Sequence, residues 1–321
     1  MKNIKKLPFI LTILSFLTIF VPANAEIKVV TSIKPIHSLA RYLMDGVAKP
    51  DLIVDGYASP HGFALKPTHA KMLQEADLVF WVGEDLENFL EKPLKSIAKK
   101  AEKIELMEIK GLTKLKFRER NIFDEHGHKE DEHGHKEDEH GHKEDEHGHD
   151  EHAHGEHDPH IWLDPMNAKV ILSEMAEHLI ENDSKNEAKY KANLKRAHKD
   201  LDQLTKKVKS ELNKDFKSIV FHDAYQYFEK RFDINVLGAF TVNTDVMPGA
   251  EQLAEIREVI EHDKVSCVFS EPQFNPDIIK AVAKDTNIAT GVIDPLGATL
   301  NPGKDLYFDL IGNMSKSFKG C

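Results

Sequence analysis

The chain has 321 residues, a length that suggests two domains, and a formal net charge of −11 at pH 7. This charge is concentrated in one stretch, because residues 124–158 hold fifteen acidic residues and three lysines and the remainder is nearly neutral. A nucleic-acid-binding protein would need a basic face, which this charge distribution does not provide. We therefore expect no nucleic-acid partner.

The first 25 residues have the three parts of a secretory signal peptide. Residues 1–6 include three lysines, residues 9–21 form an apolar run, and residues 23–25 read Ala-Asn-Ala, a typical cleavage site. The apolar run is short for a membrane span. The alternative to a cleaved signal peptide is an uncleaved membrane anchor. We expect cleavage after Ala25 and export of a mature chain that begins at Glu26.

The first half of the mature chain alternates short apolar runs with amphipathic segments. Continuous apolar runs such as residues 78–82 are typical of strands buried on both faces of a parallel sheet. The alternation of strands and helices indicates βαβ units, and hence an α/β domain over residues 26–163 that carries the acidic stretch as a loop. We expect strands at 27–31, 51–54, 78–82 and 103–107, and helices at 35–44, 67–76 and 86–100.

The same alternation returns after residue 213 and predicts a second α/β domain over residues 214–321. Each domain is expected to contain a small, mostly parallel sheet flanked by helices. In this second half we expect strands at 218–221, 234–240, 265–270 and 291–293, and helices at 224–232, 248–263, 276–285 and 304–321.

Residues 164–213 between the two domains are predicted to be helical. A first helix runs from Asp164 to about residue 180, and Ser184 with Glu187 matches a capping box at the start of a second. Apolar residues then recur every three or four positions to residue 212, which indicates one helix about 45 Å long. We expect this helix to join the domains as a stiff spine, with a long surface helix of the second domain as the alternative.

The acidic stretch repeats the unit DEHGHKE three times from residue 124 to 144, followed by a truncated copy. Neutral imidazole is the commonest protein ligand for zinc. The stretch has almost no apolar side chains for a core, and a glycine in each unit argues against a coiled coil. We expect a disordered loop that attracts metal ions, with a solvated acidic linker as the alternative. The candidate ligands are His126, His128, His133, His135, His140, His142, His147, His149, His152, His154 and His157.

Other candidate ligands follow predicted strands. His222, Glu271 and Asp294 each come directly after a strand, His61 lies in the loop after the second strand, and His160 closes the acidic stretch. Ligands of open α/β sheets bind at the carboxyl ends of the strands, so two facing domains would bring these side chains into one cleft. Three imidazoles with a water or a carboxylate suit tetrahedral zinc.

Two carboxylates are candidates for the fourth ligand. Asp294 is the first candidate and Glu271 the second, and the alternative for each is a supporting role behind a ligand. Histidines within helical patterns are assigned structural roles: His69, His178, His198 and His262.

The chain has two cysteines, Cys267 and Cys321. In an exported protein we expect them to form a disulfide, with two free thiols as the alternative. In the chain-entropy description, this disulfide would stabilise the folded protein by roughly 3–4 kcal/mol.

Several motifs together resemble one protein family. They are Ala58–His61 with Ala64–Pro67, Ala76–Gly83, Asp158–Pro165, Phe221–Tyr225, and Glu271–Phe274 with Asp294–Gly297. The acidic stretch at residues 124–158, called the His-rich loop from here on, and both cysteines add to these motifs. Together they are similar to the ZnuA family, the periplasmic zinc-binding components of bacterial ABC importers. The resemblance covers essentially the whole mature chain.

This resemblance implies a periplasmic protein with two α/β domains, a long connecting helix and limited hinge motion. It implies that His61, His160 and His222 bind zinc, whereas manganese-binding relatives usually have a carboxylate where this chain has His222. Cys267 and Cys321 match the disulfide of the family. The expected partners are zinc and a membrane permease with its cytoplasmic ATPase, and the protein is expected to be a monomer without enzymatic activity. The resemblance leaves the role of the loop open between secondary zinc capture, chaperoning and sensing.

Other functions remain as alternatives at this point. Manganese, iron or nickel is the alternative cargo. A zinc hydrolase could use the three histidines, a water and Glu271 as base, although no HExxH motif is present. An adhesion module that exposes bound metal is a third possibility.

Overall fold

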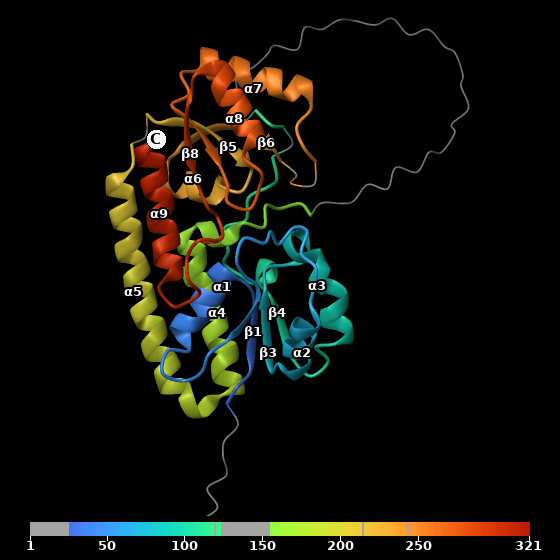
Figure 1. Cartoon of the computed structure of the whole chain (residues 1–321). Helices are drawn as coiled ribbons and strands as arrows, with labels where there is room; N and C mark the ends of the chain where they lie inside the picture. Colours follow the sequence, from blue (N-terminus) through green and yellow to red (C-terminus); the bar gives the residue numbers. More distant parts are fainter. Residues whose placement is uncertain (1–25, 119, 123–154, 214, 243, 245) are drawn as a thin grey trace, which may run out of the picture.

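The computed structural model describes residues 26–118, 120–122, 155–213, 215–242, 244 and 246–321 (Figure 1). The expected signal peptide and the loop histidines from His126 to His154 lie outside these residues, whereas His157 lies within them. In the described ranges, no helix combines the length and the apolar character needed to cross a membrane.

The first sheet has four parallel strands in the order β2-β1-β3-β4. The two central strands, β1 and β3, are buried along their whole length, as their apolar sequences predict. Figure 1 shows α1 and α4 on one side of this sheet and α2 and α3 on the other. The strands are β1 Val29–Ile33, β2 Asp51–Val54, β3 Leu78–Trp81 and β4 Glu102–Glu105, and the helices are α1 Lys34–Leu43, α2 Pro67–Glu75, α3 Glu84–Ser96 and α4 Pro165–Asn182.

The second sheet repeats this arrangement, with parallel strands in the order β6-β5-β7-β8. Helices α7 and α8 pack together and against its strands. The predicted α/β class with two small parallel sheets is therefore confirmed. The strands are β5 Lys217–His222, β6 Asn235–Thr241, β7 Cys267–Ser270 and β8 Ala289–Val292, and the helices are α6 Gln226–Phe232, α7 Ala250–His262, α8 Asp277–Thr286 and α9 Leu306–Gly320.

The long helix α5 spans Glu187–Glu211 and is shorter than predicted. Ser184–Asn186 form a separate 3₁₀ turn (η3) without a side-chain cap, so the predicted capping box at Ser184 is wrong. The buried Asp183 organises this turn instead, because its carboxylate accepts hydrogen bonds from Asn186 Nδ2 at 2.8 Å and Tyr190 Oη at 2.7 Å.

Helix α5 packs against α4 and α1 from the first half of the chain and against α9 from the second half, and Figure 1 shows it alongside both. Its buried side chains follow the predicted apolar stripe, with Tyr190, Ala197, Leu201 and Val208 fully covered. The domain boundaries at residues 163 and 213 stay a prediction.

Helix α9 is a second element that contacts both halves, because it also packs on α1. The expected disulfide joins Cys267 at the start of β7 to Cys321 just beyond α9, with 5.8 Å between the two Cα atoms. The last helix is therefore covalently fastened to the second sheet while it packs against a helix of the first.

Candidate metal centre

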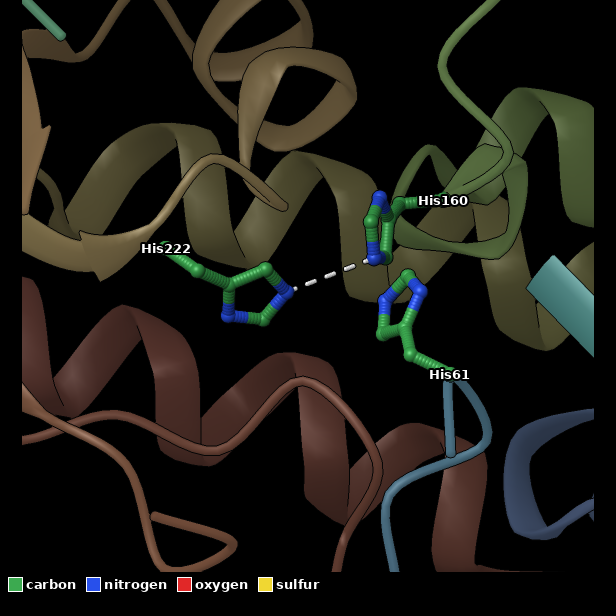
Figure 2. Close-up of side chains that lie close together, drawn as sticks. All are labelled: His61, His160 and His222. Carbon is green, nitrogen blue, oxygen red and sulfur yellow. Dashed lines mark hydrogen bonds between the residues drawn. The ribbon is translucent and has the colours of Figure 1, made fainter. Parts of the chain in front are cut away.

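Three imidazole rings from distant parts of the chain lie close together, as Figure 2 shows for His61, His160 and His222. The ring centroids lie 5.6 Å apart for His61 and His160, 5.9 Å for His61 and His222, and 5.3 Å for His160 and His222. Each ring offers a nitrogen within 4.8 Å of those of the other two. Because zinc–nitrogen bonds are about 2.1 Å long, one ion between the rings would be within reach of all three after small movements.

Each histidine is positioned by a different element. His222 is the last residue of β5, at the carboxyl end of the second sheet. His61 lies in the loop between β2 and α2, at the carboxyl end of the first sheet. His160 directly precedes a 3₁₀ turn, η2 (Ile161–Leu163), which leads into α4. Because the strands within each sheet are parallel, the rings of His222 and His61 both lie at carboxyl ends of strands, one from each sheet.

Two of the rings are oriented by carboxylates on their outer nitrogens. His222 Nδ1 donates to Glu271 Oε1 at 2.7 Å, and His160 Nδ1 donates to Asp158 Oδ1 at 2.7 Å. The His160 backbone N–H also donates to Asp158 Oδ1, at 2.9 Å. A proton held on Nδ1 leaves the Nε2 lone pair available for a metal, and the two Nε2 atoms lie 3.4 Å apart.

The pKa values of the two buried rings, His160 and His222, are shifted in opposite directions. Burial, and then the charge of His222, lower the pKa of His160 well below 6.5. Burial also lowers the pKa of His222, but the Glu271 carboxylate outweighs it and the pKa is raised above 6.5. Protons therefore compete with a metal more strongly at His222 than at His160.

Further buried acidic groups lie behind these rings. Burial raises the pKa of each of Asp158, Asp223 and Glu229 to about 7. Arg118 ion-pairs with Asp223 at 2.9 Å and with Glu229 at 2.6 Å. This cluster has three carboxyl groups and one guanidinium, so a positive ion at the three rings would favour the charged form of these carboxyl groups.

The cavity at the rings has a volume of about 10 Å³, which is room for roughly one water-sized particle. Trp162 and Phe274 supply apolar walls. Trp162 Nε1 donates to the Pro295 carbonyl at 2.8 Å and so fastens the His160 segment to the chain that follows β8. The cavity suits a single ion held by rigid walls.

The structure brings together His61, His160 and His222, and their metal-ligand group in the described chain includes neither predicted fourth ligand. Glu271 Oε1 contacts Nδ1 of His222 at 2.7 Å, on the side of the ring away from the His160 Nε2 atom. Asp294 Oδ1 accepts hydrogen bonds from Gln273 Nε2 at 2.9 Å and from the backbone of Gly297 at 2.9 Å, which makes it the centre of a turn. The fourth ligand stays a prediction.

Sequence reasoning gave Asp158 no role. The signal for it is the Asp-Pro-His order, in which an aspartate two residues before a histidine can accept from both its backbone and its ring. Of the loop histidines, His157 is half-buried and pairs with Lys116 in an isolated antiparallel bridge.

Comparison with known proteins agrees with this geometry. The family model "ZnuA: Zinc-uptake complex component A periplasmic" matches residues 29–321. The "High-affinity zinc uptake system protein ZnuA" of Brucella abortus strain 2308 is 47% identical over 303 residues, which cover 91% of each chain. Its counterpart of the same name in Yersinia pestis is 39% identical over 301 residues, which cover 92% of each chain.

A solved structure described as a 138-173 ZnuA deletion mutant with zinc bound aligns with a TM-score of 0.72 at 21% identity, covering 92% of this chain and 97% of the other. ZnuA homologues thus bind zinc, and the fold is shared. On the family match and the identity to these relatives, the chain belongs to the ZnuA family of periplasmic zinc-uptake components.

Proposed function

We propose that this protein captures zinc through His61, His160 and His222 and delivers it to the membrane permease of an ABC importer with a cytoplasmic ATPase. The convergence of the three imidazoles on one point carries the proposal. Two of them present Nε2 because a carboxylate holds Nδ1, which is a common arrangement of zinc-binding histidines. The B. abortus relative, at 47% identity, is named as a high-affinity zinc uptake protein.

A water molecule is proposed for the fourth position. Neither Glu271 nor Asp294 belongs to the ligand group of the three rings. One oxygen of each already accepts a hydrogen bond, Glu271 Oε1 from His222 and Asp294 Oδ1 from Gln273. Water completes tetrahedral zinc readily when three protein ligands are present.

The His-rich loop is proposed to collect zinc weakly and to release it beside the three rings. Its carboxyl end is anchored to the folded chain, because the Gly155 N–H donates to Asp85 Oδ1 at 2.8 Å and Glu156 ion-pairs with Lys116 at 3.1 Å. Only two residues separate His157 from His160. Zinc released by the last loop histidine would therefore be close to its destination.

The hydrolase alternative is disfavoured by the size of the cavity. A volume of about 10 Å³ holds an ion but leaves no space for an organic substrate beside it. Glu271, the proposed base of that alternative, is buried behind His222 and its Oε1 accepts from the ring. Capture and release of the ion fits this geometry better than turnover.

Deletion of residues 124–154 tests the division of labour between loop and site. We expect isothermal titration of the deletion variant with zinc to retain one tight site and to lose the weak binding that the loop histidines contribute to the intact mature chain. Competition with manganese should leave the tight site occupied by zinc. Loss of the tight site on deletion, or preference for manganese, would contradict the proposal.

The substitution Glu271→Gln tests how His222 is held. We expect zinc affinity to fall by about 10–100-fold, since an amide orients the ring without a charge. The loss of the carboxylate also removes the effect that raises the pKa of His222. Zinc binding of the variant should therefore decline at a lower pH than that of the unmodified protein as protons compete for the ring. Zinc titrations between pH 5 and pH 8 would show this, and an unchanged pH profile would contradict the role.

A further inference from the structure

A second group of possible metal ligands lies far from the three rings in the fold. It joins Glu102, the first residue of β4, to His178 and Glu181 near the end of α4. Each of the three offers a ligand atom within 4.8 Å of those of the other two. Glu102 lies at the amino end of the first sheet, whereas the loop that carries His61 leaves its carboxyl end, so the two groups occupy opposite ends of the same sheet.

Short contacts bring carboxylates to both nitrogens of the His178 ring. Nδ1 is 2.8 Å from Glu102 Oε1, and Nε2 is 3.4 Å from Glu174 Oε1, one helical turn earlier. His178 Nδ1 is shielded from solvent, yet the contact with Glu102 lacks the geometry of a hydrogen bond. His178 Nδ1 and Glu102 Oε1 are thus close to each other without forming a well-aligned hydrogen bond.

The orientation of Glu102 is set by α4 itself. Asn182 Nδ2 donates to Glu102 Oε2 at 2.9 Å and to the His178 carbonyl at 2.9 Å. One carboxylate oxygen is thereby fixed to the helix, which leaves Oε1 beside the ring. Glu181 is exposed and follows His178 by three residues, so it lies on the same helix face.

We propose that Glu102, His178 and Glu181 form a second, weaker site for zinc or a divalent ion of similar ligand preference. One imidazole with two carboxylates suits such ions, and water would complete the coordination on the exposed side. The bound ion would tie the end of α4 to the edge strand β4. The site is independent of the His-rich loop and of the transport proposal, because it shares no residue with either.

The test follows the His178 ring by NMR in the mature chain already loaded with one equivalent of zinc. The ring resonances are assigned by their absence from the His178→Ala variant. Zinc is then raised in a chelator-buffered series at pH 7.5, so that binding by the loop does not alter the free concentration. We expect a saturable shift with a midpoint below about 100 µM free zinc, as for a modest binding site.

Two glutamates of α4 provide a matched comparison for this titration. Glu181→Gln should raise the midpoint by about tenfold or more, since one ligand charge is lost. Glu177→Gln removes the same charge from an exposed position of the same helix outside the ligand group and should leave the midpoint unchanged. Resonances that stay unshifted up to about 1 mM zinc, or equal effects of both substitutions, would overturn the proposal.

Discussion

Replacement of His160 by alanine should lower the affinity of the tight zinc site by at least about 100-fold, or roughly 2.8 kcal/mol. His160 is buried, and its orientation is fixed by two hydrogen bonds to Asp158. No described side chain outside the three rings belongs to the same ligand group, so none is placed to replace it. His61→Ala should weaken binding less, because His61 lies on a less buried loop whose position can adjust.

Competition with a chelator of known zinc affinity would measure the tight site alone, without the weak sites of the loop. His262→Ala is the control, because His262 is exposed on α7 and lies outside the described ligand groups. The circular dichroism spectrum of each variant should match that of the unmodified protein. A His160→Ala protein that keeps its zinc affinity, or that loses no more than His262→Ala does, would contradict the three-histidine site.

The central strands β1, β3, β5 and β7 were predictable because they are largely buried and contain continuous apolar runs. The outer strands β4 and β8 are mostly exposed and give a weaker apolar pattern. Residues 51–54 match β2, and residues 78–82 differ from β3 by one residue. The first strand begins two residues later than expected and extends to Ile33, where it pairs with Val54 of β2. Strand ends depend on how far a neighbour continues, and the apolar pattern of a single strand does not contain that information.

Strand direction made two of the three candidate zinc ligands predictable. His61 and His222 follow strands whose carboxyl ends meet, and this position is visible in the sequence. The contact between Glu271 and the His222 ring was not predictable, because it depends on β5 lying beside β7 as well as beside β6. That neighbour relation puts Glu271 next to the His222 ring. A pattern along one chain does not distinguish a supporting carboxylate from a fourth ligand.

Contacts between distant segments were the least predictable. His178 was expected to be an ordinary helical histidine, and only the packing of α4 near β4 places Glu102 beside it. Lys34 is a second case, because a lysine at the start of a helix is usually exposed. In the structure its side chain is 4% exposed, since the chain that follows β8 covers it.

Lys34 holds the two halves of the chain together through its ammonium group. Nζ donates to the carbonyls of Gly297, Ala298 and Leu300 at 3.2, 3.0 and 3.1 Å, and lies 3.4 Å from Asp55 Oδ1. The segment it binds follows directly after Pro295, whose carbonyl accepts from Trp162 at the metal centre. Lys34 thus supports the wall of the metal centre from the side of α1.

Lys34→Met should lower the free energy of unfolding by about 3 kcal/mol, because methionine fills much of the space but leaves three backbone carbonyls without their donor. Lys28→Met is the matched control, since Lys28 lies just before β1 and pairs with Glu75 at the surface, and its loss should leave the midpoint of urea unfolding nearly unchanged. Urea titrations of both variants in the zinc-free state would measure the difference. Equal midpoints would mean that the carbonyls find water or another donor, and the two halves would then be held mainly by the packing of α5 and α9.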